Sequence, residues 1–186
     1  METLETIKTR RSVRKYTDRP VEEKVIRELI DLAVWAPSAM NTQPWGFLIL
    51  EGKEYLKELS DQAKKGLVAA ISENSDMQKY KNRLESADFN IFHNASTVVV
   101  IYGNSESSWY IYDCSLAAQN LMLAAHDKGL GTCWIGFAHQ LFDTAEFKQK
   151  HGIPEEYKVV APMALGYPEK QPGSGPSRKE YPIFGG

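Results

Sequence analysis

Apolar and polar residues follow two different spacings in the first quarter of the chain. Between Val21 and Val34, apolar residues recur every three or four positions, and Pro37 follows soon after. This pattern predicts an amphipathic helix that ends before the proline. Residues 45–50 are instead almost continuously apolar and precede Glu51-Gly52, which predicts a buried strand. A polar loop over 37–44 therefore connects a helix to a strand.

The rest of the chain mixes further strands and helices. The segment from Ser96 to Tyr102 holds a run of β-branched residues that is typical of a central strand. Four more elements are expected, namely strands over 132–137 and 158–165 and helices over 53–64 and 144–150. Asp143 should cap the last helix and Gly152 should stop it. Residues 66–91 are poorly patterned and predict no element.

One helix is expected to be unusually apolar. Residues 109–128 carry apolar side chains round most of the helix circumference, and Gly129 supplies a C-cap. A single sheet in so small a domain does not easily cover such a helix, so we expect a second subunit to bury part of it. Helices and strands lack the regular alternation of a doubly wound fold. The pattern therefore predicts an α+β fold with this long buried helix at a homodimer interface.

Length and composition narrow the class of protein. The 186 residues suit a single domain over 1–186, with the Pro- and Gly-rich stretch 167–186 as an extended C-terminal arm. The 22 basic and 24 acidic residues give a net charge of −2, which favours neither nucleic acid nor an anionic membrane as partner. The chain has two cysteines, an acidic N-terminus and no long apolar run. We therefore expect a cytoplasmic protein that does not insert into membranes.

Three short motifs carry the candidate chemistry. They are Arg10-Arg11-Ser12-Val13-Arg14, the loop Ala36-Pro37-Ser38-Ala39-Met40-Asn41-Thr42-Gln43-Pro44-Trp45-Gly46-Phe47, and Cys133-Trp134-Ile135-Gly136. Arginines supply charge for a phosphate and for an electron-rich ring, while Ser, Asn and Gln can bond the edge of a flat heteroaromatic group. If the N-terminal helix continues, the four-residue spacing places Arg10 and Arg14 on one face. Together the motifs indicate a flavin site.

In this order the motifs resemble those of the FMN-dependent nitroreductase family, which carries R-x-S-x-R/K, P-S-x-x-N-x-Q-P-W and G-L-G-x-x-W-I-G segments. The resemblance implies a central mixed sheet flanked by helices, bound FMN, and NADH or NADPH as electron donor. The nicotinamide would give a hydride to flavin N5 and then leave for a small oxidant such as a nitroaromatic or quinone. The flavin performs this chemistry, so no catalytic side chain is expected.

The resemblance also implies a set of cofactor-binding residues: Arg10, Arg11, Ser12, Arg14, Pro37, Ser38, Ala39, Asn41, Gln43, Ile135, Gly136, Arg178 and Lys179. Arg10 and Ser12 would meet the phosphate, ribityl chain or ring edge, and Arg14 the pyrimidine end. Residues 37–39 would pack on an FMN of the opposite subunit, whereas Asn41 and Gln43 would support the flavin of their own. The alternative for Arg178 and Lys179 is a charged, solvated tail.

Other chemistries lack a matching pattern. The four histidines have no metal-ligand spacing, so no metal site is expected. Gly129-Leu130-Gly131 ends a helix instead of following a strand, which excludes a Rossmann turn. Two alternatives stay open, namely a flavin-binding protein for sensing or storage that does not turn over, and a flavin reductase or specialised reductive enzyme on the same fold. The expected partners are a second copy of the chain and a small-molecule oxidant.

Overall fold

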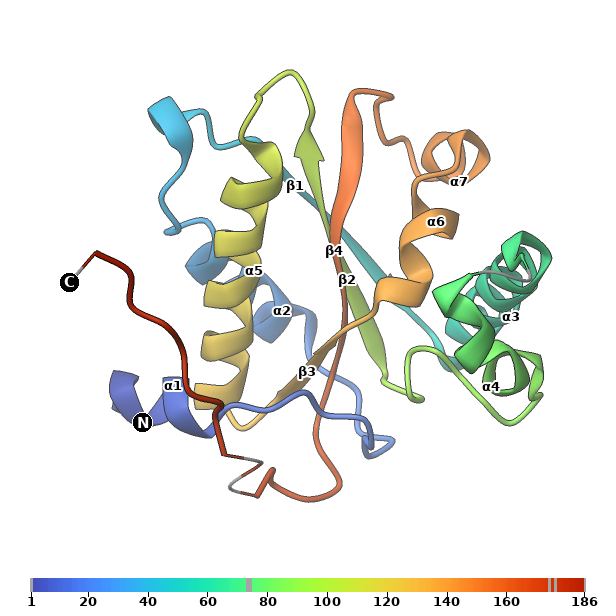
Figure 1. Ribbon diagram of the computed structural model, residues 1–186, viewed down its shortest axis with the longest axis horizontal. Helices are drawn as coiled ribbons and strands as arrows, with labels where there is room; N and C mark the ends of the chain where they lie inside the picture. Colours follow the sequence, from blue (N-terminus) through green and yellow to red (C-terminus); the bar gives the residue numbers. More distant parts are fainter. Residues whose placement is uncertain (1, 73–74, 174, 176, 186) are drawn as a thin grey trace.

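The computed structural model describes residues 2–72, 75–173, 175 and 177–185 (Figure 1). Its sheet has four strands, which are β1 (Trp45–Glu51), β2 (Thr97–Asn104), β3 (Gly131–Trp134) and β4 (Tyr157–Gly166). They lie in the order β1-β2-β4-β3, and every neighbouring pair is antiparallel. A mixed sheet was expected, and its parallel pairing is an isolated bridge between Ser12 and Thr132. The α+β class is confirmed.

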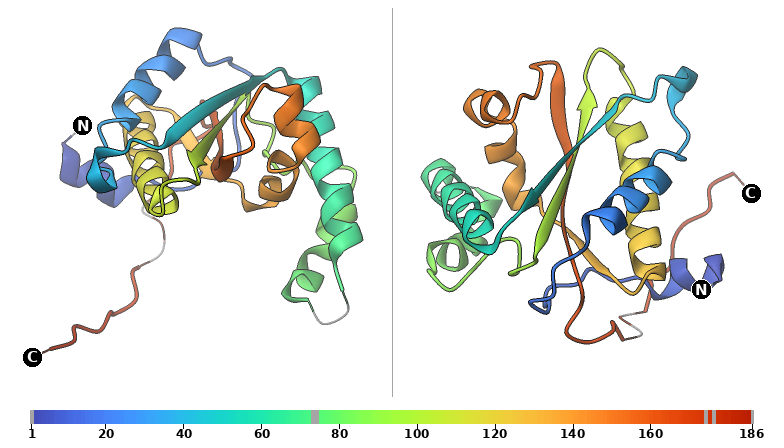
Figure 2. Two further views of the ribbon diagram at one scale, coloured as in Figure 1. Left: turned by 90° about the horizontal axis from the view of Figure 1, so that it is seen from above. Right: turned by 180° about the vertical axis from the view of Figure 1, so that it is seen from behind.

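Helices cover both faces of the sheet (Figure 2). One face carries α2 (Glu23–Ala33) and α5 (Tyr110–Asp127), and α1 (Thr3–Thr9) packs against α5. The other face carries α3 (Lys53–Ala70), α4 (Lys81–Glu85), α6 (His139–Phe142) and α7 (Ala145–Lys150). Short 3-10 turns occupy η1 (Ala39–Asn41), η2 (Asp76–Tyr80) and η3 (Gly136–Ala138). Within the described ranges, no helix combines the length and apolarity needed to cross a membrane.

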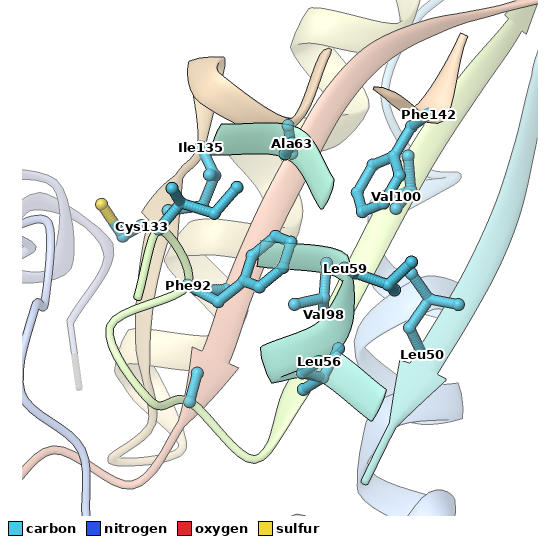
Figure 3. Close-up of a cluster of buried hydrophobic side chains, with 14 of the residues drawn as sticks. Leu50, Leu56, Leu59, Ala63, Phe92, Val98, Val100, Cys133, Ile135 and Phe142 are labelled. Carbon is cyan, nitrogen blue, oxygen red and sulfur yellow. The ribbon is translucent and has the colours of Figure 1, made fainter. Parts of the chain in front are cut away.

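The alternating side chains of β2 supply two separate cores. Val98 and Val100 belong to the core beneath α3, which Figure 3 shows with Phe92 and Phe142 around them. Val99 belongs to the core beneath α2 and α5. All three valines are fully buried because helices cover the strand on both faces. The prediction of a central strand here is confirmed.

The long helix α5 is covered more completely by its own chain than its apolar pattern predicts. The sheet and α2 together enclose residues such as Ala118 and Leu121, which have no exposed surface. A single stripe stays open, where Ile111, Tyr112 and Leu116 are 52%, 63% and 45% exposed. On α5, this exposed stripe is therefore the apolar surface that a second subunit could cover. Ala118 is not part of it, because its own chain already buries it.

Several element boundaries differ from the prediction. Helix α3 runs on to Ala70, and η2 and α4 fill much of the poorly patterned stretch, of which residues 73–74 lie outside the described residues. Strand β3 ends at Trp134 because the chain turns into η3. The cap of α7 is Thr144, whose hydroxyl accepts from the Phe147 N–H, so the assignment of Asp143 was wrong. Gly152 ends that helix with a φ of 65°, as predicted.

The C-terminal arm leaves the sheet beside the N-terminal segment. Pro168 forms a bridge with Tyr16, and the Glu169 N–H donates to the Lys15 carbonyl at 3.1 Å. Beyond this pairing the described residues of the arm form neither helix nor strand, and the end of the arm extends away from the body (Figure 2). Residues 174, 176 and 186 of the predicted arm lie outside the described residues.

Candidate functional site

The arginines lie on an extended segment at the edge of the sheet. Helix α1 ends at Thr9, and the Val13 N–H donates to the Thr132 carbonyl at 2.9 Å. Because the helix does not continue through Arg14, helical spacing does not relate Arg10 to Arg14. In extended backbone, alternate residues share a side, so Arg10, Ser12 and Arg14 lie together while Val13 is buried. We call residues 10–16 the arginine segment.

A pair of glycines makes room for the arginine segment. Gly131 and Gly166 are opposite each other in β3 and β4. A Cβ on Gly131 would come 2.5 Å from a methyl carbon of Val13, and one on Gly166 would come 2.9 Å from the Tyr16 ring. Since real Cβ atoms do not approach so closely, any larger residue would push the segment outward. Close packing on the sheet thus fixes where the arginines lie.

Arg10 and Arg14 of the arginine segment carry charges that no described carboxylate neutralises. Burial lowers the pKa of Arg10, and the positive charges of Arg11 and Arg178 lower it further. In the part of the chain that the structure describes, no carboxylate forms an ion pair with Arg10 or Arg14. Clustered, uncompensated guanidinium groups favour a bound anion such as a phosphate.

Arg11 differs from its neighbours. Its guanidinium donates to the carbonyl oxygens of Lys8 and Arg10, each at 2.7 Å, near the end of α1. It also lies against Gly175 of the C-terminal arm, where any Cβ would collide with it. We conclude that Arg11 holds local backbone, whereas Arg10 and Arg14 are available to a ligand. Arg178 approaches Arg10 from the arm, and Lys179 is exposed.

The third motif forms the floor of a hollow beside Arg14. The Ile135 N–H donates to the Pro162 carbonyl at 2.8 Å, and the Ile135 side chain is buried. A Cβ on Gly136 would meet nothing within 4 Å, so this backbone faces open space that a flat ring could fill. The hollow measures about 310 Å³. We call it the aromatic hollow, and it is lined by Arg14, Tyr80, Arg83, Phe89, Ile91, His93, Cys133, Trp134, Ile135, Gly136 and Phe137.

His93 and Cys133, which both line the aromatic hollow, are neutral at pH 7. Burial, followed by the charges of Arg14 and Arg83, lowers the pKa of His93 to about 4. Burial raises the pKa of the Cys133 thiol, although Arg14 and Arg10 oppose that rise. The positive charge in the hollow therefore comes from its arginines.

The polar loop of the second motif has a strained backbone. Met40, Asn41 and Gln43 have φ angles of 51°, 56° and 46°, a left-handed conformation that residues other than glycine rarely adopt. The Gln43 N–H donates to the Ser38 hydroxyl at 3.0 Å, and the Gln43 amide nitrogen donates to Asn41 Oδ1 at 2.9 Å. These bonds hold the loop in one shape, with Met40 94% exposed at its tip. We call residues 38–43 the polar loop.

The polar loop and the arginine segment lie at opposite ends of α5 (Figure 1). The Ala39 N–H donates to Asp113 Oδ1 at 3.1 Å in the first turn of the helix. At the other end, Thr9 and His126 share a hydrogen bond of 2.9 Å. Asp113 and His126 are 13 residues apart, or about 20 Å along a helix. One chain therefore does not bring the two motifs together.

This separation changes the expectation for Asn41 and Gln43. Both residues belong to the same rigid loop as Ser38 and Ala39, and they bond within it. The structure does not place them beside the arginine segment of their own chain. If they act on a shared cofactor, they do so together with residues 37–39 and from the same subunit.

Comparison with known proteins shows to which family the chain belongs. The model of the Nitroreductase family matches residues 7–167. The chain belongs to the nitroreductase family. It is 32% identical over 179 residues to a candidate NADH dehydrogenase/NAD(P)H nitroreductase of Methanothermobacter thermautotrophicus, covering 94% of this chain and 81% of that protein. A protein of the same description from Archaeoglobus fulgidus is 31% identical, covering 91% and 87%.

Solved structures of the nitroreductase family share the whole fold. The nitroreductase with bound FMN from Bacteroides fragilis superimposes with a TM-score of 0.78 and 31% identity. The match covers 100% of this chain and 96% of that one. The similarity therefore includes both the arginine segment and the polar loop.

The sequence did not point to one wall of the aromatic hollow. Tyr80 and Arg83 come from η2 and α4, and Phe89 and His93 follow in the loop before β2. The two elements are each only five residues long, so they show no reliable periodicity. Nothing in the spacing of residues 80–93 singled out these side chains, which converge through tertiary packing.

Proposed function

We propose that this protein is an FMN-dependent NAD(P)H oxidoreductase. It would take electrons from NADH or NADPH and pass them, in a ping-pong sequence, to a small oxidant such as a nitroaromatic or quinone. The observation that carries the proposal is the pair of uncompensated arginines, Arg10 and Arg14, beside the open backbone at Gly136. Family membership and the likeness to an FMN-bound structure support it.

The residues present fit FMN. Arg10, Ser12 and Arg178 would hold the phosphate end, Arg14 the pyrimidine end, and the backbone of Ile135 and Gly136 the face of the ring. Bound FMN would supply the two-electron redox chemistry. The chain would position it, and the positive charge of Arg14 would favour uptake of electrons.

Water exclusion and proton supply also follow from the residues of the hollow. Ile91 and Phe137 are apolar lining residues of the hollow that would keep water from the face of a bound ring. With its pKa lowered to about 4, His93 is a weak base and carries no proton to donate at pH 7, and the raised pKa of Cys133 keeps its thiol from acting as a thiolate base. We propose that solvent supplies the protons and that no side-chain acid or base is indispensable.

We infer that a second copy of the chain completes the site. An isologous contact through the open side of α5 that carries Leu116, with the two-fold axis near the exposed Gln119, would run the two α5 helices in opposite directions. The end near Asp113 of one helix would then approach the end near His126 of the other. Such an arrangement carries the polar loop of one subunit to the arginine segment of its partner. In this homodimer Pro37, Ser38, Ala39, Asn41 and Gln43 all act on the cofactor of the opposite subunit.

The stripe has suitable neighbours for such an interface. Leu4 and Ile7 of α1 are exposed apolar residues, and Trp35 after α2 is 83% exposed. Scattered apolar residues are normal on a protein surface, but a concentration on adjoining helices favours association. We propose that this surface, with the arm over 167–186, forms the dimer contact.

The absorbance spectrum of the purified protein is the first test. We expect a yellow protein whose extracted cofactor is FMN, or a colourless one that takes up FMN on titration. Anaerobic mixing with NADH or NADPH should bleach the flavin, and a quinone or nitroaromatic should restore its colour. Failure to take up FMN would overturn the proposal. Bound FMN that neither nicotinamide bleaches would instead indicate a sensing or storage role.

A further inference from the structure

One wall of the aromatic hollow consists of the aromatic side chains Tyr80, Phe89 and Phe137. Tyr80 and Phe137 meet edge to face, with ring centroids 5.4 Å apart and planes at 73°. Phe89 and Phe137 do the same at 6.4 Å and 88°. Because Tyr80 and Phe89 both pack on Phe137, the three rings form one preshaped apolar wall of the hollow. This aromatic wall suits the face of a flat aromatic molecule.

Arg83 adds a positive charge beside this aromatic wall. Its Cζ lies 4.2 Å from the centroid of the Phe89 ring, in a cation–π contact. Among the described residues no carboxylate pairs with it, and none lines the hollow. Stacking holds the guanidinium plane while its N–H edge stays available to bind an anion.

The charge of Arg83 acts on the same space as that of Arg14. Both arginines lower the pKa of His93, so the imidazole lies within the electrostatic field of each. His93 itself adds no charge at pH 7. A molecule in the hollow therefore meets two cations, three aromatic rings and no acidic side chain among the described lining residues.

We propose that the aromatic hollow selects oxidants that carry an anionic group on an aromatic ring, and that Arg83 is the residue that binds this group. This inference rests on the proposed function, since it names the class of oxidant that function would use. The aromatic body packs against the surface that Phe89 and Phe137 form together, and a carboxylate accepts hydrogen bonds from the Arg83 guanidinium. The contact is charge-assisted and distinguishes an aryl carboxylate from a neutral molecule of the same size.

Two nearly isosteric oxidants test the proposal on the holoprotein. They are 4-nitrobenzoate, which is anionic, and 4-nitrobenzamide, which is neutral. The measured quantity is the ratio of their kcat/KM values, so any loss common to both cancels. We expect the wild type to prefer the benzoate and Arg83→Gln to reduce this preference about tenfold, the size of one charge-assisted bond. Arg27→Gln is the matched control, because Arg27 is an exposed arginine of α2 that pairs with Glu23.

Equilibrium binding separates failure of this inference from failure of the proposed function. Titration with benzoate and benzamide, which are not reduced, should show an Arg83-dependent preference for benzoate. If the wild type reduces neither oxidant but keeps that binding preference, the proposed function fails and the anionic subsite stands. An equal effect of Arg83→Gln on both oxidants, or no effect, would overturn the subsite. The subsite would also be overturned if Arg83→Gln weakened FMN retention without changing the preference, because Arg83 would then bind the cofactor instead of the oxidant.

Discussion

The arginine segment and the polar loop are built in opposite ways. The arginine segment is extended, and close packing of Val13 and Tyr16 over two glycines fixes it. Among the described residues, no carboxylate pairs with its Arg10 or Arg14. The polar loop holds three left-handed residues, and its polar groups bond one another and Asp113. The first region therefore offers long-range charge, whereas the second offers hydrogen bonds in a fixed direction.

This difference explains why neither region is a site by itself. Charge alone attracts a phosphate but does not orient a ring, and a strained loop alone has no strong attraction for an anion. Their separation along α5 means that one chain presents each half at a different end. In the proposed dimer every cofactor would receive one half from each subunit.

The largest effect is expected from a variant that separates the two halves. Leu116→Glu places a charge in the exposed stripe of α5, where an unpaired buried carboxylate would cost the dimer about 3–5 kcal/mol. Sedimentation should show monomers, and the flavin should be released as the dimer dissociates. Lys65→Glu, on the exposed side of α3, serves as the control and should leave the dimer intact. A Leu116→Glu monomer that retains FMN fully would contradict the shared site.

A second variant weakens only the charged half. Arg10→Ala removes a charge-assisted bond worth about 1.5–3 kcal/mol, so FMN affinity should fall by roughly one to two decades in equilibrium dialysis. Arg14→Ala should weaken binding similarly and also lower the flavin potential, because a cation that favours added electrons is gone. Wild-type affinity and potential in both variants would show that the segment is only a solvated basic patch.

A third variant loosens only the polar half. Asp113→Ala leaves the Ala39 N–H without its acceptor, which should cost about 1 kcal/mol in binding or about a fivefold change in FMN affinity. Asp113→Asn is the matched comparison, since its amide oxygen can still accept from Ala39. Hydrogen exchange over residues 38–43 should rise in the alanine variant and less in the asparagine one. Equal exchange in all three proteins would show that Asp113 does not hold the loop.

The smallest effect at neutral pH concerns His93 in the aromatic hollow. Its folded-state pKa is about 4, and an unfolded histidine titrates near about 6.5. Between these values the unfolded state binds the proton first, so wild-type stability falls as the pH drops from 6.5 towards 4. His93→Gln removes this contribution and should lose less stability over that window. Urea unfolding at several pH values measures the difference, and parallel pH profiles would refute the assignment.

The sequence predicted the helices and strands that have strong periodicity. It did not predict conformations that depend on packing against residues far away in the chain. Helix α2 and strand β2 lie where their apolar patterns placed them. The extended form of the arginine segment depends on Gly131 and Gly166, which are more than a hundred residues away in the chain. No local pattern carries that information.

The same limit applies to the exposed faces and to the site. Because α5 carries apolar residues round most of its circumference, its sequence does not reveal that Ala118 is buried and Leu116 exposed. The packing of α2 and the sheet determines which side of the helix is covered. The motifs located the arginine segment, the polar loop and the floor of the hollow. Arg83 and its aromatic neighbours come from short elements with no periodic pattern. The roles of all these residues toward FMN stay predictions.

Mixing two defective chains tests the shared site most directly. One variant, Arg10→Ala, lacks the charged half, and the other, Ser38→Ala with Gln43→Ala, lacks the polar half. If each site combines halves from two subunits, a mixed dimer contains one intact site and one that is doubly defective. Random reassortment should therefore restore high-affinity FMN binding to about a quarter of the sites, as two-fold symmetry requires. Recovery of no high-affinity sites in verified mixed dimers would contradict the account, because it would mean that each chain builds its site alone.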